Sequence, residues 1–107
     1  MRVRATARFF EDLDHQFPSE RGRRGEPSTN DFQTFELLRI VETFAEQFYT
    51  LPELLPGRPD YRLLIATGIV VPAFSVLGQL ASDGAVELIQ LDIDLNAGGY
   101  TDTNDDG

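Results

Sequence analysis

The second half of the chain is a series of apolar runs divided by short turns that contain glycine. Tyr61–Ala66 and Ile69–Leu80 are separated by Thr67-Gly68, a pair that suits a two-residue hairpin turn. A third run, Ala85–Leu95, follows Ser82-Asp83-Gly84 and alternates, which predicts one face with Ile89, Leu91 and Ile93 and an opposite, water-facing side with Gln90, Asp92 and Asp94. The aliphatic and aromatic content of these runs is typical of strands. The pattern therefore predicts three consecutive antiparallel strands.

The start of the chain changes from a period of two to a period near that of a helix. Residues alternate between apolar and polar from Val3 to Ala7, which predicts a short strand with one polar face. Phe10, Leu13 and Phe17 then recur at steps of three and four residues. This spacing places the three side chains on one side of a short helix.

A longer helical pattern occupies the middle of the chain. Ser28 followed by Asp31 resembles a capping box at its start, and Pro52 ends it. Its predicted apolar stripe comprises Phe32, Phe35, Leu38, Val41, Phe44, Ala45 and Phe48, and is widened by Leu37 and Ile40. The side expected to face water comprises Glu36, Arg39, Thr43, Glu46 and Gln47.

These elements define an α+β fold class. The order is a short N-terminal strand, two helices, and then a three-stranded antiparallel meander with the helices packed on one face. With 107 residues and 41% hydrophobic content, the chain suffices for one domain with one core. We expect this single domain to cover residues 1–95 and to be followed by an acidic, glycine-rich tail over residues 96–107.

The stretch from Leu63 to Ser82 contains no charged residue and is long enough to cross a bilayer. Gly68, Pro72 and Gly78 interrupt it, and its β-branched and aromatic residues favour strands, so we expect no membrane span. The start of the chain shows no apolar leader segment, and there is no cysteine. These features predict a cytoplasmic protein without disulfides or thiolate metal sites.

The formal net charge of −9 sets the expected partners. All nine basic residues are arginine, a bias that suggests a bacterial genome rich in GC. Nucleic acid is an unfavourable partner because phosphates are repelled by most of this surface, whereas a basic protein is favoured. Arg21, Arg23 and Arg24 form the main basic cluster and are candidates for binding a phosphate or an acidic peptide. The alternative for this glycine-rich loop is a solvated segment without a ligand.

The element order from Met1 to about Leu95 resembles that of the RelE/ParE toxin superfamily, and Tyr61-Arg62-Leu63-Leu64 is similar to the tyrosine–arginine strand signature of that family. Its members are small cytoplasmic proteins neutralised by an antitoxin. The RelE branch cleaves ribosome-bound mRNA, and the ParE branch poisons gyrase. The resemblance implies that Arg62 contacts a phosphate or a partner, and makes it the candidate catalytic residue.

The chain departs from the family where the ribonucleases carry basic residues. Gly78-Gln79-Leu80-Ala81 stands where the family often shows a glycine-histidine-arginine element. We therefore predict a non-catalytic protein-binding domain on a RelE/ParE-like scaffold, with no cofactor. The alternative is a toxin of a type II toxin–antitoxin system, either an endoribonuclease acting on mRNA or a gyrase inhibitor. Expected partners are an antitoxin-like or basic protein, or a second copy paired through a sheet edge.

The acidic end resembles the opening of a calcium loop. Asp102, Asn104 and Asp106 are spaced as the first ligands of an EF-hand, with Gly107 at the position of the sharp turn. The later ligand positions have no counterpart in the chain. We predict no metal site, and these three residues remain the calcium candidates.

Overall fold

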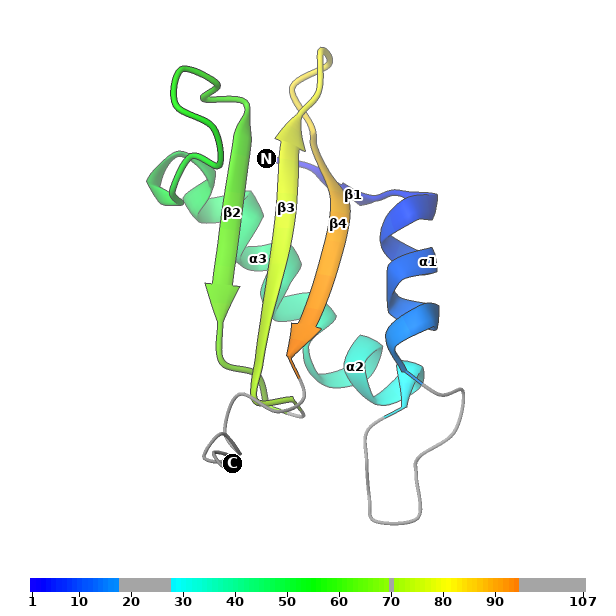
Figure 1. Cartoon of the computed structure of the whole chain (residues 1–107). Coiled ribbons are helices and arrows are strands. Elements are labelled where there is room, and N and C mark those ends of the chain that lie inside the picture. Colours follow the sequence, from blue (N-terminus) through cyan, green and yellow to red (C-terminus); the bar gives the residue numbers. More distant parts are fainter. Residues whose placement is uncertain (18–27, 70, 95–107) are drawn as a thin grey trace, which may run out of the picture.

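The computed structural model describes residues 1–17, 28–69 and 71–94. Over these ranges it contains three α-helices and a four-stranded sheet, which confirms the α+β class. The elements are β1 (Val3–Ala5), α1 (Ala7–Gln16), α2 (Thr29–Phe35), α3 (Leu37–Gln47), the 3-10 helix η1 (Phe48–Thr50), β2 (Tyr61–Ala66), β3 (Ala73–Leu80) and β4 (Val86–Asp94). Figure 1 shows the helices on one side of the sheet, with α1 beside β4.

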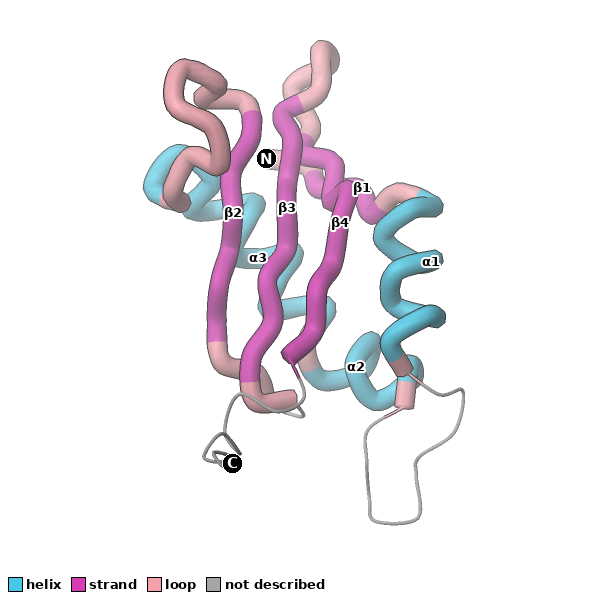
Figure 2. The backbone as a smooth tube through the Cα atoms, in the orientation of Figure 1, coloured by secondary structure: helices cyan, strands magenta, loops and turns pink. Residues whose placement is uncertain are grey.

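The sheet is mixed, and this corrects the prediction of a separate three-stranded antiparallel meander. The strand order is β1-β4-β3-β2, in which β1 runs parallel to β4 and the other neighbours are antiparallel. Val3 lies opposite Val86, and Ala5 lies opposite Leu88. Figure 2 shows this short strand beside β4. Because β1 and β4 are parallel and far apart in the sequence, no tight turn joins them, and no local sequence pattern predicts their pairing.

The strand predicted at Tyr61–Ala66 is confirmed, but the next strand starts later than its pattern suggested. β3 begins at Ala73, directly after Pro72, and not at Ile69. Proline has no N–H to donate to the ladder, so the strand starts beyond it. The N–H of Gly68 donates to the carbonyl of Val71 at 3.1 Å, which closes a longer connection than the predicted two-residue turn.

One bulge interrupts the pairing of β3 with β4. Leu77 lies opposite Gln90 and Gly78 lies opposite Leu88, which leaves Ile89 without a partner residue. An extra residue in one strand reverses the alternation of its side chains. The predicted face that Ile89 shares with Leu91 and Ile93 is therefore broken at Ile89. The β4 side chains directed towards the core are those of Val86, Leu88, Leu91 and Ile93.

Helix α1 is rotated relative to its prediction. Its buried residues are Phe9 and Leu13, whereas Phe10, predicted on the core side, is 37% exposed. Phe17, just after the helix, is buried as predicted. Both rotations satisfy helical spacing, so the apolar pattern alone did not distinguish Phe9 from Phe10.

Two polar side chains of α1 hold the helix in this rotation. The N–H of Leu91 donates to the Asp12 carboxylate at 3.0 Å, and the N–H of Ile93 donates to Gln16 Oε1 at 2.6 Å. Gln16 Nε2 also donates to the carbonyl of Leu91 at 2.8 Å. These bonds occupy the edge of β4 beyond the end of β1, where a strand would otherwise leave its backbone open.

The long middle helix begins at the predicted capping box but breaks at Glu36. Ser28 and Asp31 exchange their side-chain and backbone hydrogen bonds as predicted. The side chain of Glu36, predicted to face water, is instead 0% exposed. It accepts the N–H of Ile69 and pairs with Arg39 at 3.0 Å. Because this carboxylate is drawn inward, the chain forms two helices with Glu36 between them.

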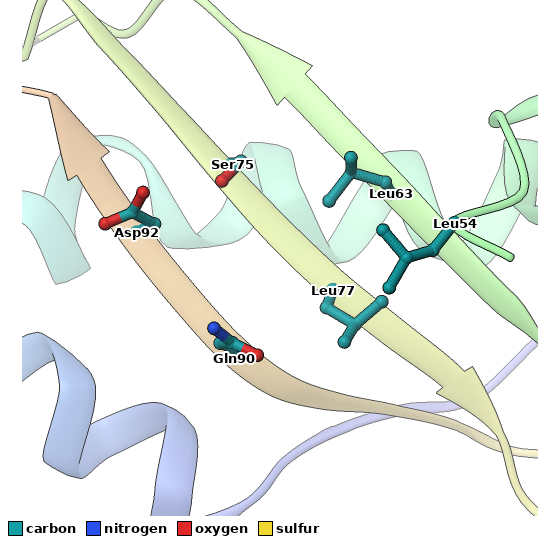
Figure 3. A pocket seen from close by; sticks show the side chains of 6 residues that line it. All are labelled: Leu54, Leu63, Ser75, Leu77, Gln90 and Asp92. Atoms are coloured by element: carbon teal, nitrogen blue, oxygen red, sulfur yellow. The ribbon is translucent and has the colours of Figure 1, made fainter.

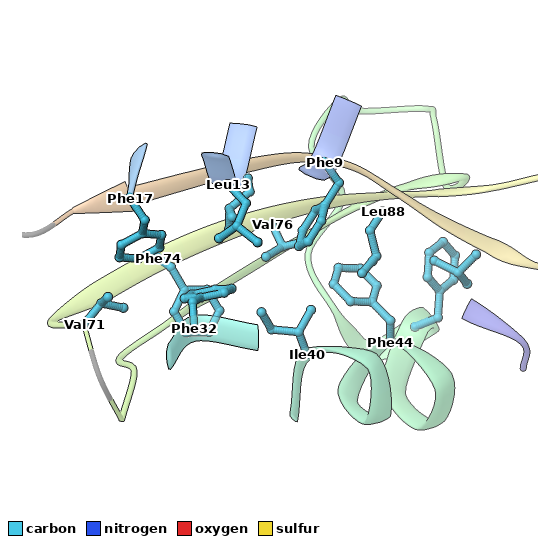
Figure 4. Close-up of a cluster of buried hydrophobic side chains, with 13 residues drawn as sticks. Phe9, Leu13, Phe17, Phe32, Ile40, Phe44, Val71, Phe74, Val76 and Leu88 are labelled. Atoms are coloured by element: carbon cyan, nitrogen blue, oxygen red, sulfur yellow. The ribbon is translucent and has the colours of Figure 1, made fainter. Parts of the chain in front are cut away.

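The core lies between the helices and one face of the sheet (Figure 4). A Cβ atom at Gly78 would collide with the ring of Phe44, so this glycine lets α3 approach β3 closely. The main buried aromatic residues are Phe9, Phe17, Phe32, Phe44, Phe48 and Phe74.

The uncharged segment from Leu63 to Ser82 contains the part of β2 that follows Arg62 and all of β3. Among the described residues, no helix combines the length and the apolar character that crossing a bilayer requires.

Candidate functional site

The face of the sheet opposite the helices carries the most distinctive described surface, which we call the open face. Strand alternation directs Leu63 and Ile65 of β2 to this side, while Arg62 and Leu64, which alternate with them, point to the helix layer. The same alternation places residues of β3 and β4 beside them. The open face comprises Leu54, Leu63, Ile65, Ala73, Ser75, Leu77, Gln90, Asp92 and Asp94.

The chemistry of the open face changes from one side of the sheet to the other. In one row across the strands, Leu63 lies opposite Leu77, which lies opposite Gln90. In the next row, Ile65 of β2 and Asp92 of β4 lie on either side of Ser75. The β2 side is therefore apolar, and the β4 side is polar and acidic.

Two neighbouring hollows follow this division. The first has a volume of about 170 Å³ and is lined by Leu54, Leu63, Ser75, Leu77, Gln90 and Asp92. Figure 3 shows its three leucines gathered on one side and its polar side chains on the other. The second has a volume of about 230 Å³ and is lined by Ile65, Ala73, Phe74, Ser75, Asp92 and Asp94. The hollows share Ser75 and Asp92, so they lie side by side on the open face.

Several of these side chains are unusually accessible. Ile65 is 69% exposed and Leu54 is 42% exposed, which leaves aliphatic surface in water. Asp92 is exposed and makes no hydrogen bond or ion pair within the described ranges of the chain. An apolar patch bordered by charge is typical of a surface that binds another molecule.

On β1, the strand beside β4, the positive charge of Arg4 is already paired with acids. Arg4 of β1 pairs with Asp83 at 2.7 Å and with Glu87 at 3.0 Å. The hydrogen bond from Arg4, assisted by the N–H of Ala85, lowers the pKa of Asp83 to about 2. These acids are therefore engaged with β1, whereas Asp92 is available to an external cation.

Arg62, the candidate carried over from the family resemblance, lies on the helix side of β2. Its side chain is only 10% exposed. Its Nε donates to the carbonyl of Pro59 at 2.8 Å, and its Nη1 donates to the carbonyls of Tyr49 and Leu51 at 3.0 and 2.9 Å. Glu53 adds an ion pair at 3.9 Å.

These contacts give Arg62 a structural role. Its guanidinium ties the segment after α3 to the start of β2, close to the rings of Phe48 and Tyr49. A phosphate at this position would have to displace backbone carbonyls from a nearly buried group. The contact of Arg62 with a phosphate or a partner stays a prediction.

The other arginines in the described ranges are also paired with acids. Arg58 forms two hydrogen bonds with Asp60, at 3.1 and 3.0 Å, and stacks on Tyr61. The arginines with an ion pair are Arg2, Arg4, Arg8, Arg39, Arg58 and Arg62.

The remaining predicted site residues lie outside the described ranges. These are the basic cluster Arg21, Arg23 and Arg24 and the calcium candidates Asp102, Asn104 and Asp106. Within the described ranges, no group of three His, Cys, Asp or Glu residues is arranged to hold a metal ion.

The sequence predicted only the acidic half of the open face. Alternation along the last strand indicated that Gln90, Asp92 and Asp94 face water. The apolar half was missed because Leu63–Ala66 is a continuous apolar run, in which no alternation distinguishes Leu63 from Leu64. The apolar half could have been inferred from two observations together. The strand is apolar on both faces, and the predicted helices cover only one face of the sheet.

Comparison of the chain with protein-family models, with curated proteins and with solved structures found no match in any of the three. The resemblance to the RelE/ParE superfamily therefore stays a prediction.

Proposed function

We propose that this chain is a small, non-catalytic protein-binding domain whose open face receives a basic, amphipathic segment of another protein. The observation that supports this most is the juxtaposition of exposed Ile65 with Asp92 across Ser75. The apolar side provides binding energy through the release of water, at about 25 cal/mol per Å² of buried apolar surface. The acidic side selects a cationic partner and sets its orientation.

For the cellular location, the scaffold and the partner, we keep the hypotheses drawn from the sequence. We propose a cytoplasmic protein on a RelE/ParE-like scaffold, with an antitoxin-like or otherwise basic protein as its partner. The net charge of −9 supports this choice, because a negative domain attracts a positive partner over the range at which ions do not screen it.

A second candidate function is the toxin of a type II toxin–antitoxin system. RNA cleavage needs cationic groups free to hold phosphates and to stabilise developing charge. The arginines in the described ranges are engaged with acids, which does not favour this function. The basic cluster Arg21, Arg23 and Arg24 would have to supply the contacts.

A homodimer could pair with only part of the outer edge of β2, because some backbone groups of this edge are already hydrogen-bonded. On the outer edge of β2, the N–H of Leu63 donates to the carbonyl of Pro52 at 3.0 Å, and the N–H of Leu54 donates to the carbonyl of Tyr61 at 3.3 Å. A second copy would therefore pair only with the part of β2 beyond Leu63. Sedimentation analysis over a range of protein concentrations tests for this dimer.

The binding function is tested by mapping amide chemical shifts. An alanine-based helical peptide with leucine on one flank and arginine on the other is titrated into the labelled protein. A second peptide, with glutamate in place of arginine, is the control. We expect the arginine peptide to shift the amides of Leu63, Ser75 and Asp92, and the glutamate peptide to leave them unchanged.

Two variants, each replacing an aliphatic side chain of similar exposure, test where the apolar side of the peptide binds. Ile65→Ser should weaken binding of the arginine peptide, whereas Leu38→Ser, at a residue 64% exposed on α3, should not. Equal effects of the two peptides, or shifts confined to the helix layer, would contradict the proposed function.

The toxin function is tested by expressing the chain in bacteria. Growth arrest with cleavage of mRNA, lost when Arg21, Arg23 and Arg24 are replaced by glutamine, would favour the toxin. Arg62→Ala is the second variant, and its folding must be checked because Arg62 holds backbone carbonyls.

A further inference from the structure

We propose that the occupant of the open face is an amphipathic α-helix that lies along β3, with an apolar flank over β2 and a cationic flank over β4. This inference rests on the proposed function and specifies the shape and the residue spacing of the partner. It follows from the contour of the open face, its dimensions and the hydrogen-bonding state of the sheet.

The contour is that of a furrow. Its floor on β3 is formed by the small side chains of Ala73 and Ser75. Larger side chains stand on either side, with Ile65 on β2 and Asp92 on β4. Both hollows include Ser75 and the first reaches Leu77, so the lined surface follows β3, and the larger side chain of Leu77 ends the floor of small residues.

The dimensions of the furrow match those of a helix. From β2 to β4 there are two strand spacings, which together measure roughly 9.6 Å. The diameter of a helix with its side chains is about 10 Å. A helix centred over Ser75 therefore covers Ile65 with one flank and Asp92 with the other.

The spacing along the strands defines the sequence of the helix. Leu63 and Ile65 are alternate residues of β2, so they are about 6.8 Å apart along the strand. Residues four apart on a helix rise by about 6 Å. The partner should therefore carry two aliphatic residues four apart on one flank, and an arginine or lysine that reaches Asp92 on the other.

An extended segment has a similar spacing, but its backbone distinguishes it from a helix. The N–H and C=O groups of β3 are directed in the plane of the sheet towards β2 and β4, not towards the open face. A strand lying on this face would bury its own backbone groups without partners, whereas a helix satisfies them internally. The furrow thus favours a helix.

The test compares peptides that differ only in their capacity to form a helix. The first is the alanine-based leucine–arginine peptide, and the second has proline at two central alanines. We expect the prolines to lower the affinity for the open face by about a hundredfold or more, since each strongly destabilises a helix. Equal affinity of the two peptides at the open face would overturn the helix and leave the proposed function in place.

A spin label on either end of the helical peptide tests the direction of its axis. A label at one terminus should broaden the amide signals of Leu77 and Gln90, and a label at the other should broaden those of Ala73 and Asp94. Broadening of the same signals by both labels would contradict an axis along β3. Protection of the Ile65 amide from exchange, with no shift at Ser75, would show that the peptide adds as a strand to the edge of β2.

A variant that fills the furrow provides the matched control. Ser75→Leu should weaken binding of the helical peptide by about fivefold or more, because it raises the floor of the furrow. Gln33→Leu, at an exposed position of α2, should leave it unchanged. If neither peptide shifts any amide of the open face, the proposed function itself fails, and the helix proposal fails with it.

Discussion

At the scale of single residues, Gly78 determines how closely α3 approaches the sheet. The ring of Phe44 occupies the space that a side chain at position 78 would need. Gly78 also lies at the bulge, where the pairing of β3 with β4 changes register. One glycine therefore serves both the packing of the core and the local twist of the strands.

We predict that Gly78→Ala destabilises the fold by about 1–3 kcal/mol, because the added methyl group overpacks a well-filled core. Chemical denaturation measures the change. Adding Phe44→Leu should cost less in the Gly78→Ala background than in the wild type, since the smaller side chain relieves the collision. Additive effects of the two substitutions would show that Phe44 and Gly78 are not coupled.

Arg62 is the second residue whose role depends on its contacts. We predict that Arg62→Ala lowers the free energy of unfolding by about 2 kcal/mol or more, because it leaves the carbonyls of Pro59, Tyr49 and Leu51 without their donor. Arg62→Lys should recover only part of this, since one ammonium cannot reproduce a planar guanidinium.

Arg58→Ala is the matched control for this measurement. Arg58 is half exposed and its pair with Asp60 lies in water, so its loss should change stability little. If Arg62→Ala were as mild as Arg58→Ala, the structural role of Arg62 would be wrong, and a role in binding would become more attractive.

At the scale of elements, β1 depends on ion pairs as well as on its ladder. It has three residues, and Arg4 connects it to Asp83 in the turn before β4 and to Glu87 in β4 itself. The N–H of Val86 donates to the carbonyl of Arg2 at 2.8 Å, so the turn and β1 are fixed together.

This arrangement predicts an acid-sensitive β1. The Arg4 hydrogen bond lowers the pKa of Asp83 from 3.8 to about 2, so the stabilisation is complete above pH 3.8 and is lost as the pH falls towards 2. Hydrogen exchange at the amides of β1 and thermal unfolding across this window measure the effect. Asp83→Asn should flatten the acid dependence, and an unchanged slope in this variant would contradict the assignment.

The elements also show what local patterns can and cannot reveal. β2, the capping box at Ser28 and the turn through Gly84 followed from residue types and spacing, because each depends on neighbouring residues. The inward turn of Glu36 did not, since it depends on the N–H of Ile69, which is remote in sequence. The rotation of α1 was equally inaccessible, because it depends on Asp12 and Gln16 meeting β4.

At the scale of the whole molecule, the distribution of paired charges matters more than the net charge. The arginines of the described ranges are paired with acids, which leaves Asp92 to act on a partner. The sequence indicated the acidic side of the open face through alternation. It did not reveal the apolar side, which becomes visible only when the register places Ile65 and Leu63 across from Ser75 and Leu77.

The central claim is that the open face binds a cationic, amphipathic segment, and a charge exchange measured by calorimetry tests it most directly. The dissociation constants of the arginine and glutamate peptides are compared for the wild type, for Asp92→Arg, and for Glu46→Arg, a control that makes the same charge change on the helix layer. We predict that Asp92→Arg weakens binding of the arginine peptide by about fivefold or more and strengthens binding of the glutamate peptide. Glu46→Arg should change neither affinity. Equal responses of Asp92→Arg and Glu46→Arg would contradict the account.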